Sequence, residues 1–209
     1  MENDTTVFVV EDDAAARESI VALVGQKGLQ AEGFSSADDF LAQYDPSRKG
    51  CVVLDIGVAG MSGLDLLQKL KARKSALPIV VITGFADVPM AVRAMQEGAV
   101  TFLEKPCQDE QLWEAITQAL EIEQTQHAQR KQRAEMEARL AMLTEDEREV
   151  FRRLLAGHAN KRIAVDLDIG LRTVELRRAN IMRKMQATSL PDLVRMAILL
   201  DLLKAEDSA

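Results

Sequence analysis

The sequence contains few of the residues that stabilise secreted or membrane-embedded proteins. Among its 209 residues are 2 cysteines and 5 prolines, and only 4% are aromatic. Cys51 and Cys107 lie in or beside strand-like segments, so we expect reduced thiols and no disulfide framework. The first residues, MENDTT, are acidic and lack the apolar stretch of a signal peptide. No apolar run approaches the length of a membrane span, and we therefore expect a cytoplasmic protein.

Motifs that mark several enzyme classes are also absent. The chain has no P-loop, no GxSxG nucleophile elbow and no HExxH zinc motif. Its histidines, His127 and His158, have no partners at metal-ligand spacing. Because the sequence shows none of these sets of catalytic residues, we expect that the chain is not an enzyme.

Charge, by contrast, is plentiful and unevenly distributed. The net charge is −7, but residues 1–124 carry 10 basic and 20 acidic side chains, whereas residues 125–209 carry 16 basic and 13 acidic ones. Within residues 148–195 the count is 11 basic to 5 acidic. An acidic first half and a basic patch in the second half suggest that only the second half meets nucleic acid.

Four buried-strand patterns in the first half alternate with helical patterns. They are TVFVV (6–10), CVVL (51–54), PIVVI (78–82) and TFLE (101–104). Short continuous apolar runs are typical of strands covered on both faces of a parallel sheet. Ser36, Ser62 and Asp87 mark helix starts. Five strand–helix units in about 120 residues predict an α/β fold with a doubly wound, five-stranded parallel sheet.

Polar residues follow these strands at their carboxyl ends, where parallel sheets bind ligands. They are Glu11 and Asp12, Asp55, Thr83, and Lys105 followed by Pro106. Crowded carboxylates repel one another unless protons or a cation neutralise them, and Mg²⁺ suits an oxygen-rich pocket that also receives a phosphate. Each residue alone would be an ordinary turn residue, but the combination predicts a pocket that accepts a phosphoryl group.

The second half has helical patterns throughout. Residues 109–140 contain no glycine or proline and predict one long helix, either a solvated connector or a weak pairing surface. A small all-α unit follows. Thr144 and Glu147 form a capping box, Asn160 is expected to cap a short helix, and two further helices follow, the first of them over residues 171–185.

The first half, over about residues 1–120, resembles the receiver domain of two-component response regulators. The resemblance rests on VVEDD (9–13), LDIGVAGMSG (54–63), ITGFADVPMAV (82–92) and FLEKP (102–106). One departure is Val58-Ala59, where the family usually has Met-Pro; its effect is open, since the loss of proline frees the loop beside the site.

The receiver resemblance implies a role for each residue of the pocket. Asp55 would be the phosphoacceptor, Lys105 would pair with the phosphoryl oxygens, and the bond from Lys105 to Pro106 would be cis. Mg²⁺ would be bound by Asp12, Asp55, the carbonyl of Gly57 and, through water, Glu11. Thr83 would turn toward the phosphoryl group and draw Phe102 inward, and the surface with Val88 and Val92 would pair two receivers.

Residues 143–197 resemble the LuxR-type helix-turn-helix, and the whole chain resembles the NarL/FixJ family, closest to its FixJ branch. Val174, Ile181 and Met185 form one helical stripe that we expect to face the core. The resemblance implies that Glu175, Leu176 and Ala179 enter the major groove and read bases. The expected contacts to phosphate are Lys161, Arg172, Thr173, Arg178 and Arg183. Gly170-Leu171 replaces a frequent Ser-Pro pair, and Arg177 replaces a frequent histidine and adds charge close to the DNA face.

The expected organisation is a receiver domain over residues 1–122, a linker helix over 123–142 and a DNA-binding domain over 143–209. The implied partners are a sensor histidine kinase, double-stranded DNA and, after phosphorylation, a second copy of the chain, with RNA polymerase as a further candidate. One alternative is a DNA-binding protein with a vestigial receiver, although its five pocket residues are intact. Another is an aspartate-nucleophile phosphatase, which needs a second acid where this chain has Gly57.

Overall fold

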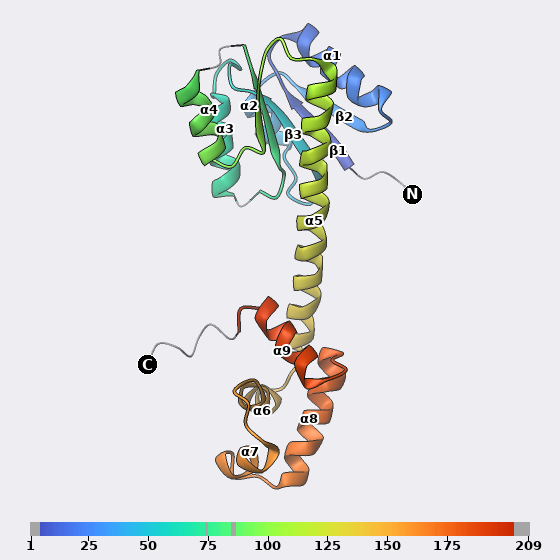
Figure 1. Ribbon diagram of the computed structural model, residues 1–209, viewed down its shortest axis with the longest axis vertical. Coiled ribbons are helices and arrows are strands. Elements are labelled where there is room, and N and C mark those ends of the chain that lie inside the picture. Colours follow the sequence, from blue (N-terminus) through green and yellow to red (C-terminus); the bar gives the residue numbers. More distant parts are fainter. Residues whose placement is uncertain (1–4, 74, 85–86, 203–209) are drawn as a thin grey trace. The chain divides into compact units, whose positions relative to one another are not determined.

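The computed structural model describes residues 5–73, 75–84 and 87–202, and its contacts divide the chain into two compact units. The first unit is Met1–His127 and the second is Ala128–Ala209. Helix α5, Asp109–Ala141, is continuous through the boundary, as residues without glycine or proline predicted (Figure 1). The fold therefore consists of an α/β unit and an all-α unit that share one helix.

The first unit is built on a parallel sheet of five strands in the order β2-β1-β3-β4-β5, which confirms the predicted fold class. The strands are β1 Thr5–Val10, β2 Gln30–Phe34, β3 Lys49–Asp55, β4 Ile79–Thr83 and β5 Thr101–Glu104. Four of them contain the apolar runs that predicted them. The strand β2, with the sequence QAEGF, lies at an edge of the sheet and exposes most of its side chains.

The helices between the strands are α1 Ala14–Gln26, α2 Ala37–Gln43, α3 Gly63–Ala72 and α4 Val88–Gln96. Helices α2, α3 and α4 begin where the capping residues predicted. Ser36, Ser62 and Asp87 each accept a hydrogen bond from a backbone N–H in the first turn of the helix that follows. Asp13 caps α1 in the same way, with 2.7 Å from the Ala16 nitrogen to Asp13 Oδ1.

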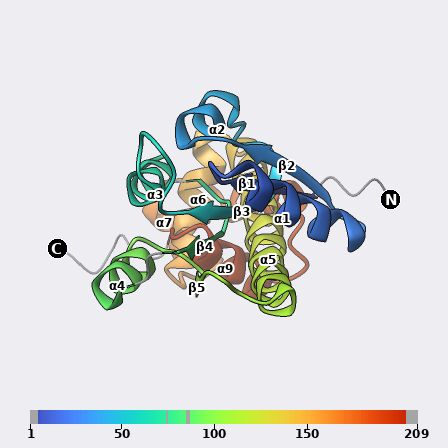
Figure 2. The ribbon, with the colours of Figure 1, turned by 90° about the horizontal axis from the view of Figure 1, so that it is seen from above.

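Apolar side chains fill both faces of the sheet, as continuous apolar strands require. One face packs Val7, Val9 and Val53 against Ile20 of α1 and Ile116 of α5. The other face packs residues of the same strands against α2, α3 and α4. Figure 2 shows these two helix layers from above. Cys51 is a free thiol in the first of these cores, and burial raises its pKa to about 12, with a contribution from the negative charge of Glu123.

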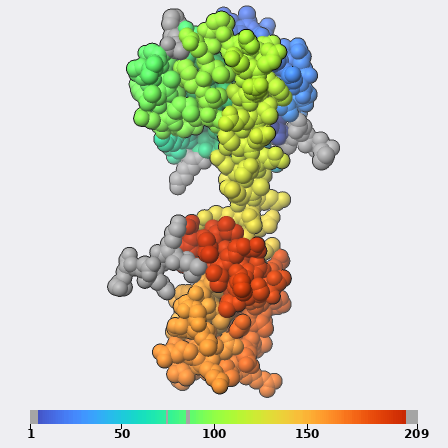
Figure 3. All heavy atoms as spheres, viewed as in Figure 1, coloured from blue at the N-terminus to red at the C-terminus, as the bar shows by residue number. Residues whose placement is uncertain are grey.

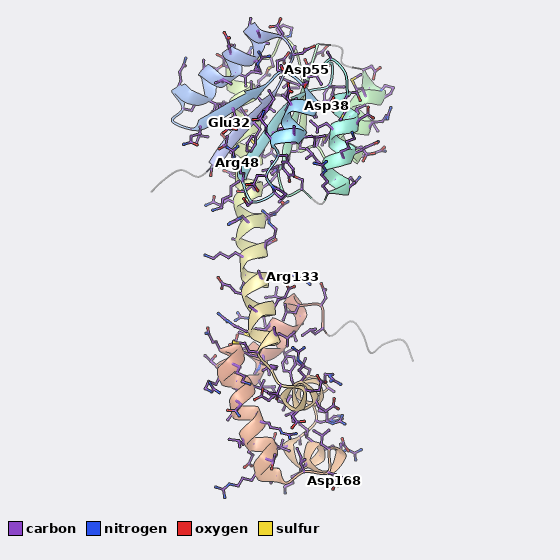
Figure 4. All side chains as sticks on the ribbon, turned by 180° about the vertical axis from the view of Figure 1, so that it is seen from behind. Glu32, Asp38, Arg48, Asp55, Arg133 and Asp168 are labelled. Carbon is purple, nitrogen blue, oxygen red and sulfur yellow. The ribbon has the colours of Figure 1, made fainter. Side chains whose placement is uncertain are left out.

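The edge strand β2 is joined to the sheet's interior by Arg48. Its guanidinium forms two hydrogen bonds to the Glu32 carboxylate, at 2.8 and 2.5 Å, and lies 4.7 Å from the centre of the Phe8 ring. The hydrogen bond from Arg48 holds the pKa of Glu32 below its usual value. Figure 4 labels this pair and, nearer the upper end of the sheet, Asp55.

The second unit contains α6 Glu145–Leu155, α7 Asn160–Asp166, α8 Leu171–Met185 and α9 Leu190–Leu199. The predicted capping box of Thr144 and Glu147 is confirmed. The core of this unit buries Val174, Ile181 and Met185, as predicted. Met136 and Leu140 of α5 belong to the same core. The predicted cap at Asn160 is wrong: Ala159 precedes the helix without a side-chain cap, and Asn160 is its first residue.

None of the helices in the described part of the chain is both long and apolar enough to cross a membrane.

Candidate functional site

The pocket residues predicted from the sequence converge at the carboxyl ends of the strands. Glu11 directly follows β1, Asp55 ends β3, Thr83 ends β4, and Lys105 directly follows β5. The sheet register brings them together because neighbouring parallel strands end at the same level. The backbone N–H of Lys105, for example, donates to the carbonyl of Thr83 at 2.8 Å. The peptide bond between Lys105 and Pro106 is cis, as expected.

Lys105 is the centre of the pocket. Its ammonium nitrogen lies 2.5 Å from Glu11 Oε2 and 2.6 Å from Asp55 Oδ2, so that it bridges two carboxylates. The backbone N–H of Gly57 donates to the other oxygen, Asp55 Oδ1, at 2.7 Å. Both oxygens of Asp55 are therefore held, and the carboxylate has a fixed orientation.

Burial and charge act against each other in this pocket. Glu11 is only 1% exposed, and this burial raises its pKa, although the hydrogen bond from Lys105 lowers it. Burial alone would lower the pKa of Lys105, but hydrogen bonds to Asp55 and Glu11 outweigh that effect and raise it. The ammonium ion is consequently held charged between two carboxylates.

An oxygen-rich group beside this bridge fits a divalent cation. One carboxylate oxygen from each of Glu11, Asp12 and Asp55 can be chosen so that all three lie within 4.8 Å of one another. Hard cations such as Mg²⁺ prefer carboxylate and carbonyl oxygens, and one ammonium does not balance three carboxylates. The carbonyl of Gly57 as a fourth ligand stays a prediction, because the contact that the structure shows is made by its N–H.

The loop after Asp55 is packed tightly against the pocket. A side-chain carbon added at Gly63 would lie 2.7 Å from the carbonyl oxygen of Asp55, so that only glycine fits there. Val58, which stands in place of the usual methionine, is buried in the core of the α2–α4 face. This loop is therefore anchored by an apolar side chain although it lacks the proline.

The expected switch residues lie at the neighbouring strands. Thr83 is 1% exposed, and Phe102 is partly buried against the core of the α2–α4 face. Helix α4, green in Figure 3, lies on the outer surface of the first unit, and Val88 and Val92 on it are 77% and 48% exposed. Met95, which the sequence reasoning missed, is also exposed and continues the spacing of these two residues along one helix face.

The second unit exposes the residues predicted to read bases. Glu175, Leu176 and Ala179 lie on the solvent face of α8, opposite its buried stripe, and Leu176 is 62% exposed. Lys161, Arg172, Thr173 and Arg183, the expected phosphate contacts, are exposed as well.

Two arginines of α8 make contacts that the sequence did not predict. Arg178 is half-buried, and its Nη1 donates to Asn160 Oδ1 at 3.1 Å, which connects α8 to the start of α7. Arg177 pairs with Asp146 of α6. The Asp146 carboxylate partly offsets the charge of Arg177, and the position of that charge close to the DNA face stays a prediction.

The C-terminal end of α8 is fixed by a largely buried ion pair between Lys184 and Glu147. Lys184 Nζ lies 2.6 Å from Glu147 Oε2 and donates to the carbonyl of Met142 at 3.1 Å. The same Glu147 oxygen accepts from the backbone N–H of Thr144 at 2.9 Å. This pair connects the exposed helix α8 to the segment between α5 and α6.

Both units match known protein families. Residues 7–117 match the response regulator receiver domain, and residues 141–197 match the luxR family of bacterial regulatory proteins. The chain is 44% identical to the transcriptional regulatory protein FixJ of Azorhizobium caulinodans over 208 residues, which cover 100% of this chain and 99% of that protein. It is 40% identical to the response regulator protein TodT of Pseudomonas putida, over 91% of this chain and 84% of that one.

Solved structures of response regulators are also similar to this chain. The structure of the response regulator StyR has a TM-score of 0.85 at 39% identity and covers 93% of this chain and 98% of that chain. Full-length FixJ from B. japonicum has a TM-score of 0.57 at 41% identity and covers 94% and 97% of the two chains.

Proposed function

The chain belongs to the FixJ-like response regulators, which join a receiver domain to a LuxR-type DNA-binding domain, and we propose that phosphorylation of Asp55 controls its dimerisation and DNA binding. It is a two-component regulator of transcription. The observation that carries the proposal is the bridge of Lys105 between Glu11 and Asp55 at the strand ends. Such a bridge orients a carboxylate and holds a cation where phosphoryl oxygens arrive.

Asp55 acts as the nucleophile in this proposal. One of its carboxylate oxygens forms a bond to the phosphorus of a phosphohistidine on the partner kinase, while the bond between phosphorus and the histidine nitrogen breaks. Lys105 then pairs with the phosphoryl oxygens. Asp12, Asp55, the Gly57 carbonyl and, through water, Glu11 would hold Mg²⁺, which when bound neutralises negative charge on the phosphoryl group. The chain is a phosphoryl acceptor rather than an enzyme, since Gly57 stands where a phosphatase needs its second acid.

The phosphoryl group is proposed to change the surface around α4. Thr83 turns its hydroxyl toward the new oxygens, and Phe102, which is only partly buried, fills the space that Thr83 leaves. The exposed Val88, Val92 and Met95 then form an apolar stripe that pairs with the same stripe of a second copy. Exposed apolar residues grouped on one helix face support an interaction surface.

Pairing strengthens DNA binding because it presents two recognition helices to two half-sites about one helical turn apart. Linking two weak modules raises apparent affinity by roughly 10²–10⁴ without a new base contact. In this proposal Glu175, Leu176 and Ala179 read bases, and the exposed basic residues around them contact phosphates. RNA polymerase is a further candidate partner on the promoter.

The proposal is tested by sedimentation and DNA binding with and without beryllofluoride, a phosphoryl mimic. Wild-type protein should shift toward dimer and bind DNA more tightly, and Asp55→Asn should do neither. Val92→Asp should keep the modification at Asp55 but lose the dimer, because it places charge in the apolar stripe. Equal DNA affinity of wild-type protein and Asp55→Asn under beryllofluoride would instead support a vestigial receiver.

A further inference from the structure

We infer that Arg17 is a positioning residue for the cation site, because it fixes the loop that carries Glu11 and Asp12. The inference rests on the proposed Mg²⁺ site and extends it to a residue that supplies no ligand. Arg17 lies in the first helix α1, one turn beyond the acidic pair, and its side chain is half-buried.

One guanidinium nitrogen of Arg17 contacts the backbone of both acidic residues. Its Nη1 donates to the carbonyl of Glu11 at 2.7 Å and to the carbonyl of Asp12 at 3.2 Å. The backbone N–H of Glu11 donates in turn to the carbonyl of Phe34, at the end of β2, at 3.0 Å. The loop between β1 and α1 is therefore fixed from the sheet on one side and from α1 on the other.

Gly33 of β2 leaves the space through which the Arg17 side chain runs. A side-chain carbon added at Gly33 would lie 3.0 Å from both Cγ and Cδ of Arg17. The backbone of Gly33 does not have a positive φ, so alanine there would meet the arginine without any backbone strain. The arginine and the glycine are thus complementary, although they lie on different elements.

The position of this contact matters because Asp12 is exposed. If the backbone of this loop were flexible, the Asp12 side chain would lose conformational entropy when it binds a cation, and this loss weakens binding. Arg17 removes part of that freedom beforehand, since one nitrogen of its planar, rigid guanidinium donates to both carbonyls. Residues that orient metal ligands from behind change metal affinity about 10–100-fold when they are replaced.

The experiment is a calorimetric titration of the full chain with Mg²⁺ alone, without a phosphodonor. Arg17→Met keeps the stem over Gly33 but removes the donors, and we expect about 10–100-fold weaker binding. Arg17→Lys should recover part of the affinity, because its ammonium reaches a carbonyl. Gly33→Ala should weaken binding less than Arg17→Met, because it displaces the arginine without removing it. Gly25→Ala is the matched control, because a side chain there meets nothing within 4 Å.

Thermal unfolding in EDTA, measured on the same variants, separates positioning from a general contribution to stability. If Arg17→Met and Gly33→Ala bind Mg²⁺ as wild type does, whatever their melting temperatures, the contact is only structural and the inference is overturned. If Arg17→Met does not fold, Gly33→Ala alone decides. If wild-type protein binds no Mg²⁺ and Asp12→Asn gives the same trace, the proposed cation site itself is wrong.

Discussion

The two units both bury charged side chains, but with different balances of charge. In the first unit, Lys105 lies between Glu11 and Asp55, and Asp12 adds a third carboxylate beside them. In the second unit, Glu147 and Lys184 form a one-to-one pair whose remaining contacts are to backbone groups. The first arrangement keeps an excess of negative charge, and the second is compensated.

This difference separates a site that needs a ligand from a pair that supports the fold. Crowded carboxylates in a partly buried place favour a cation or a proton, so the pocket of the first unit can bind a positively charged ligand. A compensated pair with satisfied hydrogen bonds gains nothing from a ligand. Its role is to fix α8 relative to α6, so that the exposed face of α8 is presented in one orientation.

The largest effect is expected from removing the ammonium group of Lys105 from the pocket of the first unit. Lys105→Met should lower the rate at which a small phosphodonor modifies Asp55 by about 10²–10³, since a preorganised donor to developing negative charge is lost. Mass spectrometry of the modified aspartate over time measures this rate. Lys184→Met is the matched control and should react at the wild-type rate. Equal rates for both variants would mean that the two buried lysines do not differ in function.

The stability of the second unit should respond in the opposite way: Lys184→Met should lower it more than Lys105→Met does. Lys184→Met leaves Glu147 buried without its cation, and breaking a fully buried pair costs about 3–5 kcal/mol. The Lys184 side chain is 21% exposed, so we expect a smaller loss, about 2–3 kcal/mol. Glu147→Gln combined with Lys184→Met should recover part of it, because glutamine preserves the capping box and no charge remains.

Spectroscopy can assign this loss to one unit. The only tryptophan and the only tyrosine, Trp113 and Tyr44, both lie in the first unit. Chemical unfolding of Lys184→Met should therefore shift the circular dichroism transition of the helical second unit without an equal shift in tryptophan fluorescence. An equal shift in both signals would show that the pair supports the whole chain rather than the second unit.

A third contrast lies within the second unit, between residues that read bases and residues that contact phosphates. Glu175→Ala should change the preference at one base pair by about 1–3 kcal/mol. Lys161→Ala should weaken all sequences alike and reduce the slope of log affinity against log salt by about one. Binding to a panel of single-base variants at several salt concentrations measures both. An unchanged preferred site in Glu175→Ala would mean that another face of α8 reads the DNA.

The sequence predicted those features that each depend on one strand or one helix. Apolar runs located four strands, and the polar residue after each run located the pocket. The strand β2 was not located, because an edge strand needs no continuous apolar run, and its QAEGF sequence has the composition of a loop. Caps next to their helices were predicted at Ser36 and Thr144 because these contacts are local.

Contacts between elements could not be predicted in the same way. Asn160 was expected to cap a helix, but its side chain accepts from Arg178, 18 residues further along. Arg177 pairs with Asp146, which lies 31 residues before it, and no local pattern indicated this partner. Long basic side chains can reach many partners, and tertiary packing decides which one they meet. For the same reason the contact of Arg17 with the acidic loop was not visible in the sequence.

The smallest effect is expected from acid. Burial alone would raise the pKa of Glu147, but the hydrogen bond from Lys184 and the N–H of Thr144 outweigh it and lower the pKa below the usual 4.5. A lowered folded-state pKa contributes stability above the unfolded value, and this contribution is lost as the pH falls below it. The second unit of wild-type protein should therefore lose stability below about pH 4.5, and Glu147→Gln should lose less over the same range. Circular dichroism melts between pH 6 and pH 3.5 measure both slopes. Because glutamine cannot titrate, an equal slope in the two proteins would mean that other carboxyl groups cause the acid sensitivity and that this pair contributes little to it.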